Sequence, residues 1–288
     1  MRRIVLHLIR STLVMVLVAP AASATTIGGC EIKPSAVCTA LDLTGANLSK
    51  ASLARADFSD SDLSGADLRT ADLTNADLSG VTLSGAHLAG VKLRGAALAG
   101  VVSGGIIGTP VSLPVGWKLV KGFLVGPKAI LIEADLVGGS LRSADLTGAD
   151  LTNADLRGVS LAGAKLRGAT LESIKSGDIL GSPSSLPFGW KLVKGYLVGP
   201  DADLSGALLR GASLKGVNLS GSNLQTADLS SADLTGADLS GSCLVWANLT
   251  RTKLAGAKLT ASLSGSIVGV PASLPAGWIL TAGKLLKR

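Results

Sequence analysis

Residues 66–75 read ADLRT ADLTN, two copies of a five-residue unit with a small residue, an acidic residue and a leucine in its first three positions. The unit repeats in both directions along the chain. A large apolar residue stands at every fifth position from Leu43 to Leu98, from Leu131 to Leu171 and from Leu204 to Leu259. These three runs hold 12, 9 and 12 units, and every central residue is leucine except Phe58.

A period of five residues fits neither an α-helix nor a long β-strand. Inside one unit the small residue and the leucine are two positions apart, so they share one face of an extended chain. The two residues after the leucine are mostly turn formers, such as Thr44 and Gly45. Each unit is therefore predicted to be a very short strand followed by a corner.

The A(D/N)LXX pattern, seen again at Ala154-Asp155-Leu156-Arg157-Gly158, resembles the pentapeptide-repeat family. With the signal-like residues 1–24 described below, an exported, bacterial-type member of that family is expected. The resemblance implies an all-β fold, a right-handed, four-sided β-helix solenoid in which four units make one coil. The leucine and the small residue would then point into a narrow core, and the other three residues would point outward. Leucines twenty residues apart would stack on one another.

Residues 1–24 have the features of a secretory signal peptide. A basic start and Arg10 precede an apolar stretch, and Ala22-Ser23-Ala24 is a small-x-small cleavage pattern. The expected result is an exported protein, cleaved near Ala24, that is periplasmic, secreted or on the cell surface. The apolar stretch is shorter than the ~20 residues of a membrane span, so no span is expected after cleavage; an uncleaved anchor is the alternative.

The repeats are interrupted twice by the same segment, here called the Trp cassette, and a third copy ends the chain. The first two copies contain Trp117 and Trp190, and the third contains Trp278. The pattern Trp-Lys-Leu-Val, Lys-Gly, Phe/Tyr-Leu-Val predicts two strands around a tight turn. Two interpretations are open: the cassette packs its tryptophan on a coil as a cover or cap, or it forms a recurring ligand or partner pocket.

The expected organisation has eight parts. They are the signal peptide (1–24), an N-terminal cap segment (25–40), repeat run 1 (41–102), Trp cassette 1 (103–128), repeat run 2 (129–173), Trp cassette 2 (174–201), repeat run 3 (202–261) and Trp cassette 3 as a C-terminal cap (262–288).

Three cysteines remain after the signal peptide is excluded. Cys30 and Cys38 are close in sequence and are expected to form a disulfide in an oxidising compartment. Cys243 has no obvious partner and stands with Trp246 in outward positions of the repeat, so these two residues are a candidate partner contact.

Catalytic, cofactor and metal sites are not expected. His87 is the only histidine after the signal peptide, and its outward position offers nothing to seclude a base. Stacked carboxylates such as Asp57 and Asp77 supply too few oxygens for a bound cation. Beyond residue 24 there are 24 basic and 20 acidic residues, spread without a basic block, so no nucleic-acid partner is expected.

The leading hypothesis is an exported, non-enzymatic structural or protein-interaction scaffold that binds an unidentified protein or cell-surface partner on flat faces. The alternative comes from the resemblance, because some pentapeptide-repeat proteins imitate DNA and bind DNA gyrase. Against it, four aspartates each have a lysine twenty residues further on, which would cancel an acidic field: Asp72, Asp145, Asp233 and Asp238. The sequence leaves the oligomeric state open.

Overall fold

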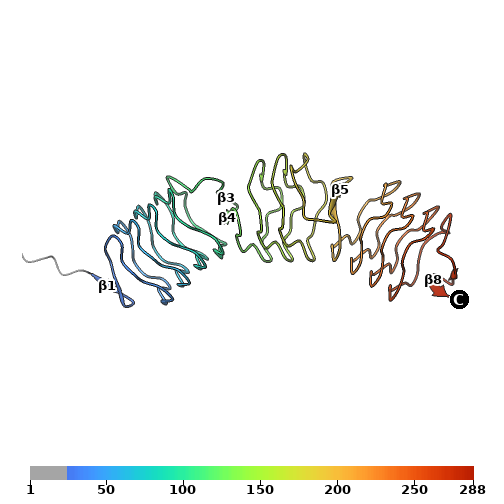
Figure 1. The fold of residues 1–288 in the computed structure, drawn as a ribbon, viewed down its shortest axis with the longest axis horizontal. Coiled ribbons are helices and arrows are strands. Elements are labelled where there is room, and N and C mark those ends of the chain that lie inside the picture. The colour runs from blue at the N-terminus through green and yellow to red at the C-terminus, as the bar shows by residue number, and fades with distance from the viewer. Residues whose placement is uncertain (1–24) are drawn as a thin grey trace, which may run out of the picture.

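The computed structural model describes residues 25–288, so the expected signal peptide lies outside the described residues. The described chain is all β, without a helix, and forms an elongated solenoid that curves gently along its length (Figure 1). Its named strands pair as four antiparallel hairpins: β1 (Thr26–Ile27) with β2 (Cys30–Glu31), β3 (Lys118–Val120) with β4 (Phe123–Val125), β5 (Lys191–Val193) with β6 (Tyr196–Val198), and β7 (Trp278–Thr281) with β8 (Lys284–Lys287).

Isolated parallel β-bridges hold the coils together. Asp42 bridges to Asp62, and Asp62 bridges to Thr82, so one coil takes twenty residues, or four units. The hydrogen bonds are short: the Leu43 N–H donates to the Asp62 carbonyl at 2.8 Å. Each coil thus contributes one residue to each of four files of bridged residues. We number them from their members in one coil: first (Asp42), second (Asn47), third (Ser52) and fourth (Asp57).

The core is a stack of leucines. All the central residues of the three runs are buried, with at most 2% of their surface exposed. The position two before each leucine is buried wherever it lies inside the stack, and where it is polar its hydroxyl finds a backbone partner. Ser61 donates to the Cys38 carbonyl at 2.7 Å, and Thr252 donates to the Leu229 carbonyl at 2.8 Å. Few residue types fit this position, because a longer side chain would meet the opposite wall.

The corners are β-turns that the sequence pattern encodes. The Ala46 N–H donates to the Leu43 carbonyl, and Gly45 has a φ of 65°, as position i+2 of a type II turn requires. The residue before the leucine supports the same corner, because the Asp42 carboxylate accepts the Thr44 N–H at 3.0 Å. The repeated Asp or Asn therefore has a structural role, in addition to the solvated-surface role that the sequence indicated.

Each Trp cassette contains the predicted hairpin. In the first, the turn residues Lys121 and Gly122 have φ values of 50° and 80°, as in a type I′ turn. The turn reaches across the coil, where the Gly122 carbonyl accepts the Ile106 N–H, while the Leu124 N–H donates to the Ser103 hydroxyl. The other two hairpins make the same two contacts. The carbonyls of Gly195 and Gly283 accept the N–H groups of Ile179 and Ile267. The hydroxyls of Ser176 and Ser264 accept the N–H groups of Leu197 and Leu285.

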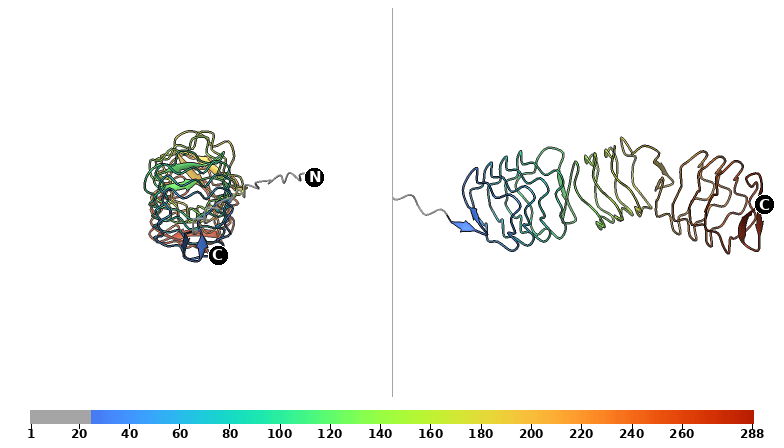
Figure 2. Two further views of the ribbon diagram at one scale, coloured as in Figure 1. Left: turned by 90° about the vertical axis from the view of Figure 1, so that its left-hand side faces the viewer. Right: turned by 60° about the horizontal axis from the view of Figure 1, so that its bottom comes forward.

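The hairpins lie between blocks of core. Leu124 is buried in the core of run 1, whereas its neighbour Val125 is buried in the core of run 2. Trp117 packs against both. Figures 1 and 2 show the resulting three blocks, with β3–β4 and β5–β6 at the junctions and β7–β8 at the far end.

The coils are interrupted over fewer residues than the expected bounds of the first two cassettes, 103–128 and 174–201, suggest. Ile107 and Ser112 still bridge to run 1, so the coil continues into the cassette. Bridging across the hairpin then takes twenty-eight residues, from Val102 to Ile130, instead of twenty. The hairpin thus replaces one unit of a coil and adds eight residues, which explains why the leucine register shifts there.

We expect Leu151→Asp, in the middle of run 2, to destabilise the fold by about 3–5 kcal/mol, because it buries an unpaired charge. The matched control is Asn153→Asp, which adds the same charge at an exposed corner where Asp tolerates the φ of 59°. Thermal melts followed by circular dichroism measure both. Equal melting temperatures would contradict the inward assignment of the leucines.

The third hairpin covers the end of the last core, where Leu285 and Ile267 are buried and Trp278 packs beside them. We expect a chain that stops after Ser264 to keep its coils but to associate, because apolar surface and unpaired backbone groups are then exposed. Light scattering of the truncated and full mature chains at equal concentration tests this. If both are monodisperse monomers, cassette 3 is not a cap.

Candidate functional site

The N-terminal end is closed by a covalent link. The predicted disulfide between Cys30 and Cys38 is present, with the two Cα atoms 5.1 Å apart and both residues buried. It ties the β1–β2 hairpin to the first coil, and Ile27 packs against the same core. The disulfide therefore holds the segment that covers the first coil.

Cys243 and Trp246 lie on the last complete coils. Cys243 belongs to the second file, bridged to Asn223 and Leu263, and is partly buried with a free thiol. Trp246 occupies the next corner with a φ of 63° and 55% of its surface exposed. A bulky side chain at positive φ is an outlier, and most corners in this chain have Gly or a small polar residue at that position.

Trp246 belongs to an exposed apolar patch that the sequence did not reveal. Trp246 lies at the corner between the second and third files, and its backbone N–H donates to the Gly265 carbonyl of the next coil. On that coil Leu263 and Val268, which flank the corner, are 62% and 50% exposed. We call Trp246, Leu263 and Val268 the tryptophan patch. An interaction surface is the usual reason for such a group.

Local hydrogen bonds hold several outward aspartates as carboxylates, Asp67 and Asp57 among them. Hydrogen bonds from the Arg69 guanidinium, and then from the Arg69 N–H, lower the pKa of Asp67 to about 2 from its ordinary 3.8. At Asp57 the N–H and then the hydroxyl of Ser59 lower the pKa of the carboxyl. These charges stabilise corners and are not poised for proton transfer near neutral pH.

The predicted Asp–Lys pairs lie across adjacent coils. Asp145 and Asp233 are bridged to Lys165 and Lys253 through the backbone, but these side chains form no ion pair within the described chain. Asp72 and Asp238 are bridged to Lys92 and Lys258 and do form ion pairs, with Nζ–Oδ2 distances of 3.4 and 3.2 Å. All four side chains are partly exposed to water, so each pair contributes only ~0–1 kcal/mol. Their main effect is to cancel local charge.

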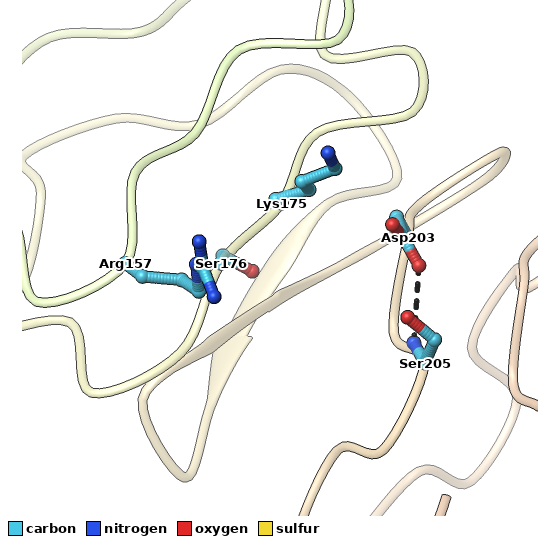
Figure 3. A pocket seen from close by; sticks show the side chains of 5 residues that line it. All are labelled: Arg157, Lys175, Ser176, Asp203 and Ser205. Carbon is cyan, nitrogen blue, oxygen red and sulfur yellow. Dashed lines mark hydrogen bonds between the residues drawn. The ribbon is translucent and has the colours of Figure 1, made fainter. Parts of the chain in front are cut away.

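Surface hollows on the described chain are shallow and open. The one in Figure 3, of about 240 Å³, spans the second junction and is lined by Arg157, Lys175 and Asp203. The Asp203 carboxylate accepts the Ser205 N–H at 3.1 Å and the Asn223 amide at 3.2 Å, while Arg157 pairs with Asp155 at 2.6 Å. Most of its polar groups already have partners within the protein.

The described residues contain no cluster of three His, Cys, Asp or Glu side chains able to hold a metal ion. His87 lies in the second file between Asp67 and Ile107. Over residues 25–288 no helix is long and apolar enough to cross a bilayer.

The coil geometry agrees with a match between the sequence and a family model. The model for pentapeptide repeats matches residues 36–75, 66–102, 134–172 and 202–241, which together make up half of the chain. The chain belongs to the pentapeptide-repeat family. No curated protein matches it. Pentapeptide-repeat proteins are generally non-enzymatic scaffolds that mediate protein interactions.

Solved pentapeptide-repeat structures are similar to this chain. HetL, involved in heterocyst differentiation regulation in the cyanobacterium Nostoc sp. strain PCC 7120, is 32% identical over 81% of this chain and 84% of its own, with a TM-score of 0.25. Trypsin-treated QnrB1, a plasmid-mediated fluoroquinolone resistance protein, is 18% identical over 78% and 83%, with a TM-score of 0.23. Rfr23 from Cyanothece 51142 is 22% identical over 52% and 90%, with a TM-score of 0.18. At these TM-scores no residue roles transfer.

The lowered pKa values predict an acid-sensitive fold. A carboxyl whose folded pKa is lowered contributes stability that is complete above its ordinary pKa and is lost as the pH falls through the folded pKa. For Asp67 this window runs from about pH 4 down to about 2. We expect Asp67→Asn, which keeps the accepting oxygen but does not titrate, to show a smaller loss of melting temperature across it. If carboxyl NMR placed the Asp67 pKa near 4, the proposed hydrogen bonds would be wrong.

Proposed function

We propose that this protein is an exported, non-enzymatic interaction scaffold of bacterial type that binds its partner through the tryptophan patch. The observation that carries the proposal is Trp246, a large apolar side chain exposed at a corner where its backbone conformation is unfavourable. A bulky residue in such a conformation costs stability, and more than half of its surface stays exposed, which favours a role in binding. Leu263 and Val268 widen the contact to an area that one aromatic residue would not provide.

Export is part of the proposal. It is supported by the signal-like residues 1–24 and by the Cys30–Cys38 disulfide, since disulfides persist mainly in oxidising compartments. The mature chain would begin near Thr25, and its location would be the periplasm, the cell surface or the medium.

The proposal also includes a right-handed, four-sided coil. Four bridged files and four corners in every twenty residues support four sides. Such a coil presents its outward residues on flat faces, and the tryptophan patch lies where two of these faces meet.

The experiment uses Trp246→Gly. Glycine suits the positive φ at this corner, so we expect the melting temperature to stay the same or rise. A photocrosslinker on Cys243 should then capture the partner from intact cells with the native chain but lose most of the yield with Trp246→Gly. Mass spectrometry of the mature chain should locate its first residue near Thr25.

The matched control is Thr226→Gly, at the same corner one coil earlier with a φ of 59°. It should capture the partner as well as the native chain does. If the Trp246→Gly variant captures the partner with the yield of the native chain, the patch is not the contact. The same holds if both variants lose the same share of the yield. An uncleaved chain in the cytoplasmic fraction would refute export.

The alternative function is a DNA mimic that binds a type II topoisomerase such as DNA gyrase. One observation favours it: Glu133, Glu172 and Asp201 all lie at the corner between the first and second files, beside aspartate-rich files. Inhibition of gyrase supercoiling by the purified mature chain, lost on Glu133→Lys with Glu172→Lys, would establish it over the scaffold.

A further inference from the structure

Two neighbouring hollows at the first Trp cassette form one groove. The first, about 540 Å³, is lined by Arg55, Lys92 and Arg94. The second, about 610 Å³, is lined by Leu113, Val115 and Trp117. Arg94 lines both, so the basic and apolar parts are continuous. We call them together the cassette groove.

The groove exists because the hairpin replaces the fourth unit of its coil. Val102 is bridged to Ile130, so no ordinary strand fills that side, and Leu98 and the exposed rim of Trp117 line the gap. Trp117 is fixed there, because Gly126 has no side chain and lies against the indole ring. The tryptophan part of the apolar wall is therefore preformed, which lowers the cost of binding.

The charge of the groove is positive. Arg55 and Arg94 are exposed and form no ion pair, and Lys128 adds a third cation at the apolar end. The one carboxylate on the lining, Asp72, is occupied by Lys92 at 3.4 Å and by the Thr74 N–H at 3.0 Å. Arginines offer paired N–H donors that match carboxylate or phosphate.

The corner between the third and fourth files extends this charge along the solenoid. None of the described residues at this corner is acidic. Arginines recur there in all three runs: Arg55, Arg94, Arg142, Arg210 and Arg251. At ~4.8 Å per coil, successive arginines are about 10–15 Å apart. A row at this spacing suits a long partner with repeated anionic groups better than a compact anion.

The rim of the second cassette is less basic, although it has the same hairpin and keeps Arg167 and Lys165 at the positions of Arg94 and Lys92. Asp201 stands at the position of Lys128, and Glu172 stands at that of Ala99. An anion would be repelled there. The cassettes thus share their packing residues but differ at the rim, so the rim of the first cassette is not required by the fold.

We propose that the cassette groove binds a linear anionic polysaccharide. Carboxylate or other anionic groups pair with Arg55 and Arg94, and the apolar face of a sugar ring packs in the hollow beside Trp117 and Val115. The charge selects an anion, and the apolar hollow selects a sugar over an anion without rings. The inference rests on the proposed export, which brings the protein to where such polymers occur.

The experiment measures fluorescence anisotropy of a labelled linear oligogalacturonate with the mature chain at low salt. We expect saturable binding that weakens as salt increases. Arg55→Ser with Arg94→Ser should weaken Kd about tenfold, and so should Val115→Asp, which puts an acid into the fully exposed apolar wall.

Each variant has a matched control. Arg167→Ser with Lys215→Ser removes the same charge from another corner, and Phe188→Asp makes the equivalent change in the second cassette. Both should change Kd less than about twofold. All variants should have the same melting temperature as the native chain, since the altered side chains are exposed.

Three results would overturn the proposal. The first is the absence of saturable binding, and the second is an equal loss of affinity with the double control Arg167→Ser with Lys215→Ser. The third is polyphosphate that binds as tightly as the glycan and whose Kd does not change with Val115→Asp. The tryptophan patch lies on a different corner, so crosslinking from Cys243 separates the two hypotheses. Undiminished capture by Trp246→Gly together with the expected glycan binding refutes the patch contact alone. Loss of capture by Trp246→Gly without saturable glycan binding refutes the groove alone.

Discussion

The structure depends on the width of its core. One leucine and one small residue from each unit must fill the space between opposing walls, and the parallel bridges require the same residues to recur every twenty positions. A wider side chain at the small position would push the walls apart and break the bridges on both sides. This explains why polar exceptions such as Ser61 and Thr252 are accepted only with a backbone acceptor in reach. Because these side chains fill the inside of the described coils, recognition is favoured on the outside.

Outward residues fall into two groups under this constraint. Those before the leucine, such as Asp57, are tied to the adjacent corner by hydrogen bonds to the N–H two residues on. Those at the corners are free to vary wherever φ is tolerated, and they carry the side chains without a structural task, such as Arg55 and Trp246. Both proposed contacts include corner residues, Trp246 in the patch and Arg55 with Arg94 in the groove, because these can change without disturbing the coil.

The sequence predicted what is local or strictly periodic. The leucine spacing predicted the core, the Lys-Gly turn predicted the hairpins, and the short spacing of Cys30 and Cys38 predicted the disulfide. It did not predict that Asp42 would cap its own corner, because an outward carboxylate and a capping one look alike in a repeat. It named Trp246 as a candidate partner contact but missed Leu263 and Val268, the rest of the tryptophan patch, and it missed the cassette groove. Arg94 and Trp117 come together only through the eight extra residues of the hairpin, and Trp246 meets Leu263 only through the stacking of coils.

The third hairpin shows how the same motif can either join blocks or end them. In the first two copies Val125 and Val198 are buried against the next block, and Gly126 and Gly199 leave room for the tryptophan ring. The third copy has Leu286 and Lys287 at these places, and Leu286 remains 46% exposed. Because β8 pairs Lys287 with Trp278, the chain continues as strand where the other copies turn away into a new coil. A lysine there cannot be buried under a further block without losing its hydration. The residues that follow the shared turn therefore decide whether another block can stack, and the charged ones at the third copy oppose it.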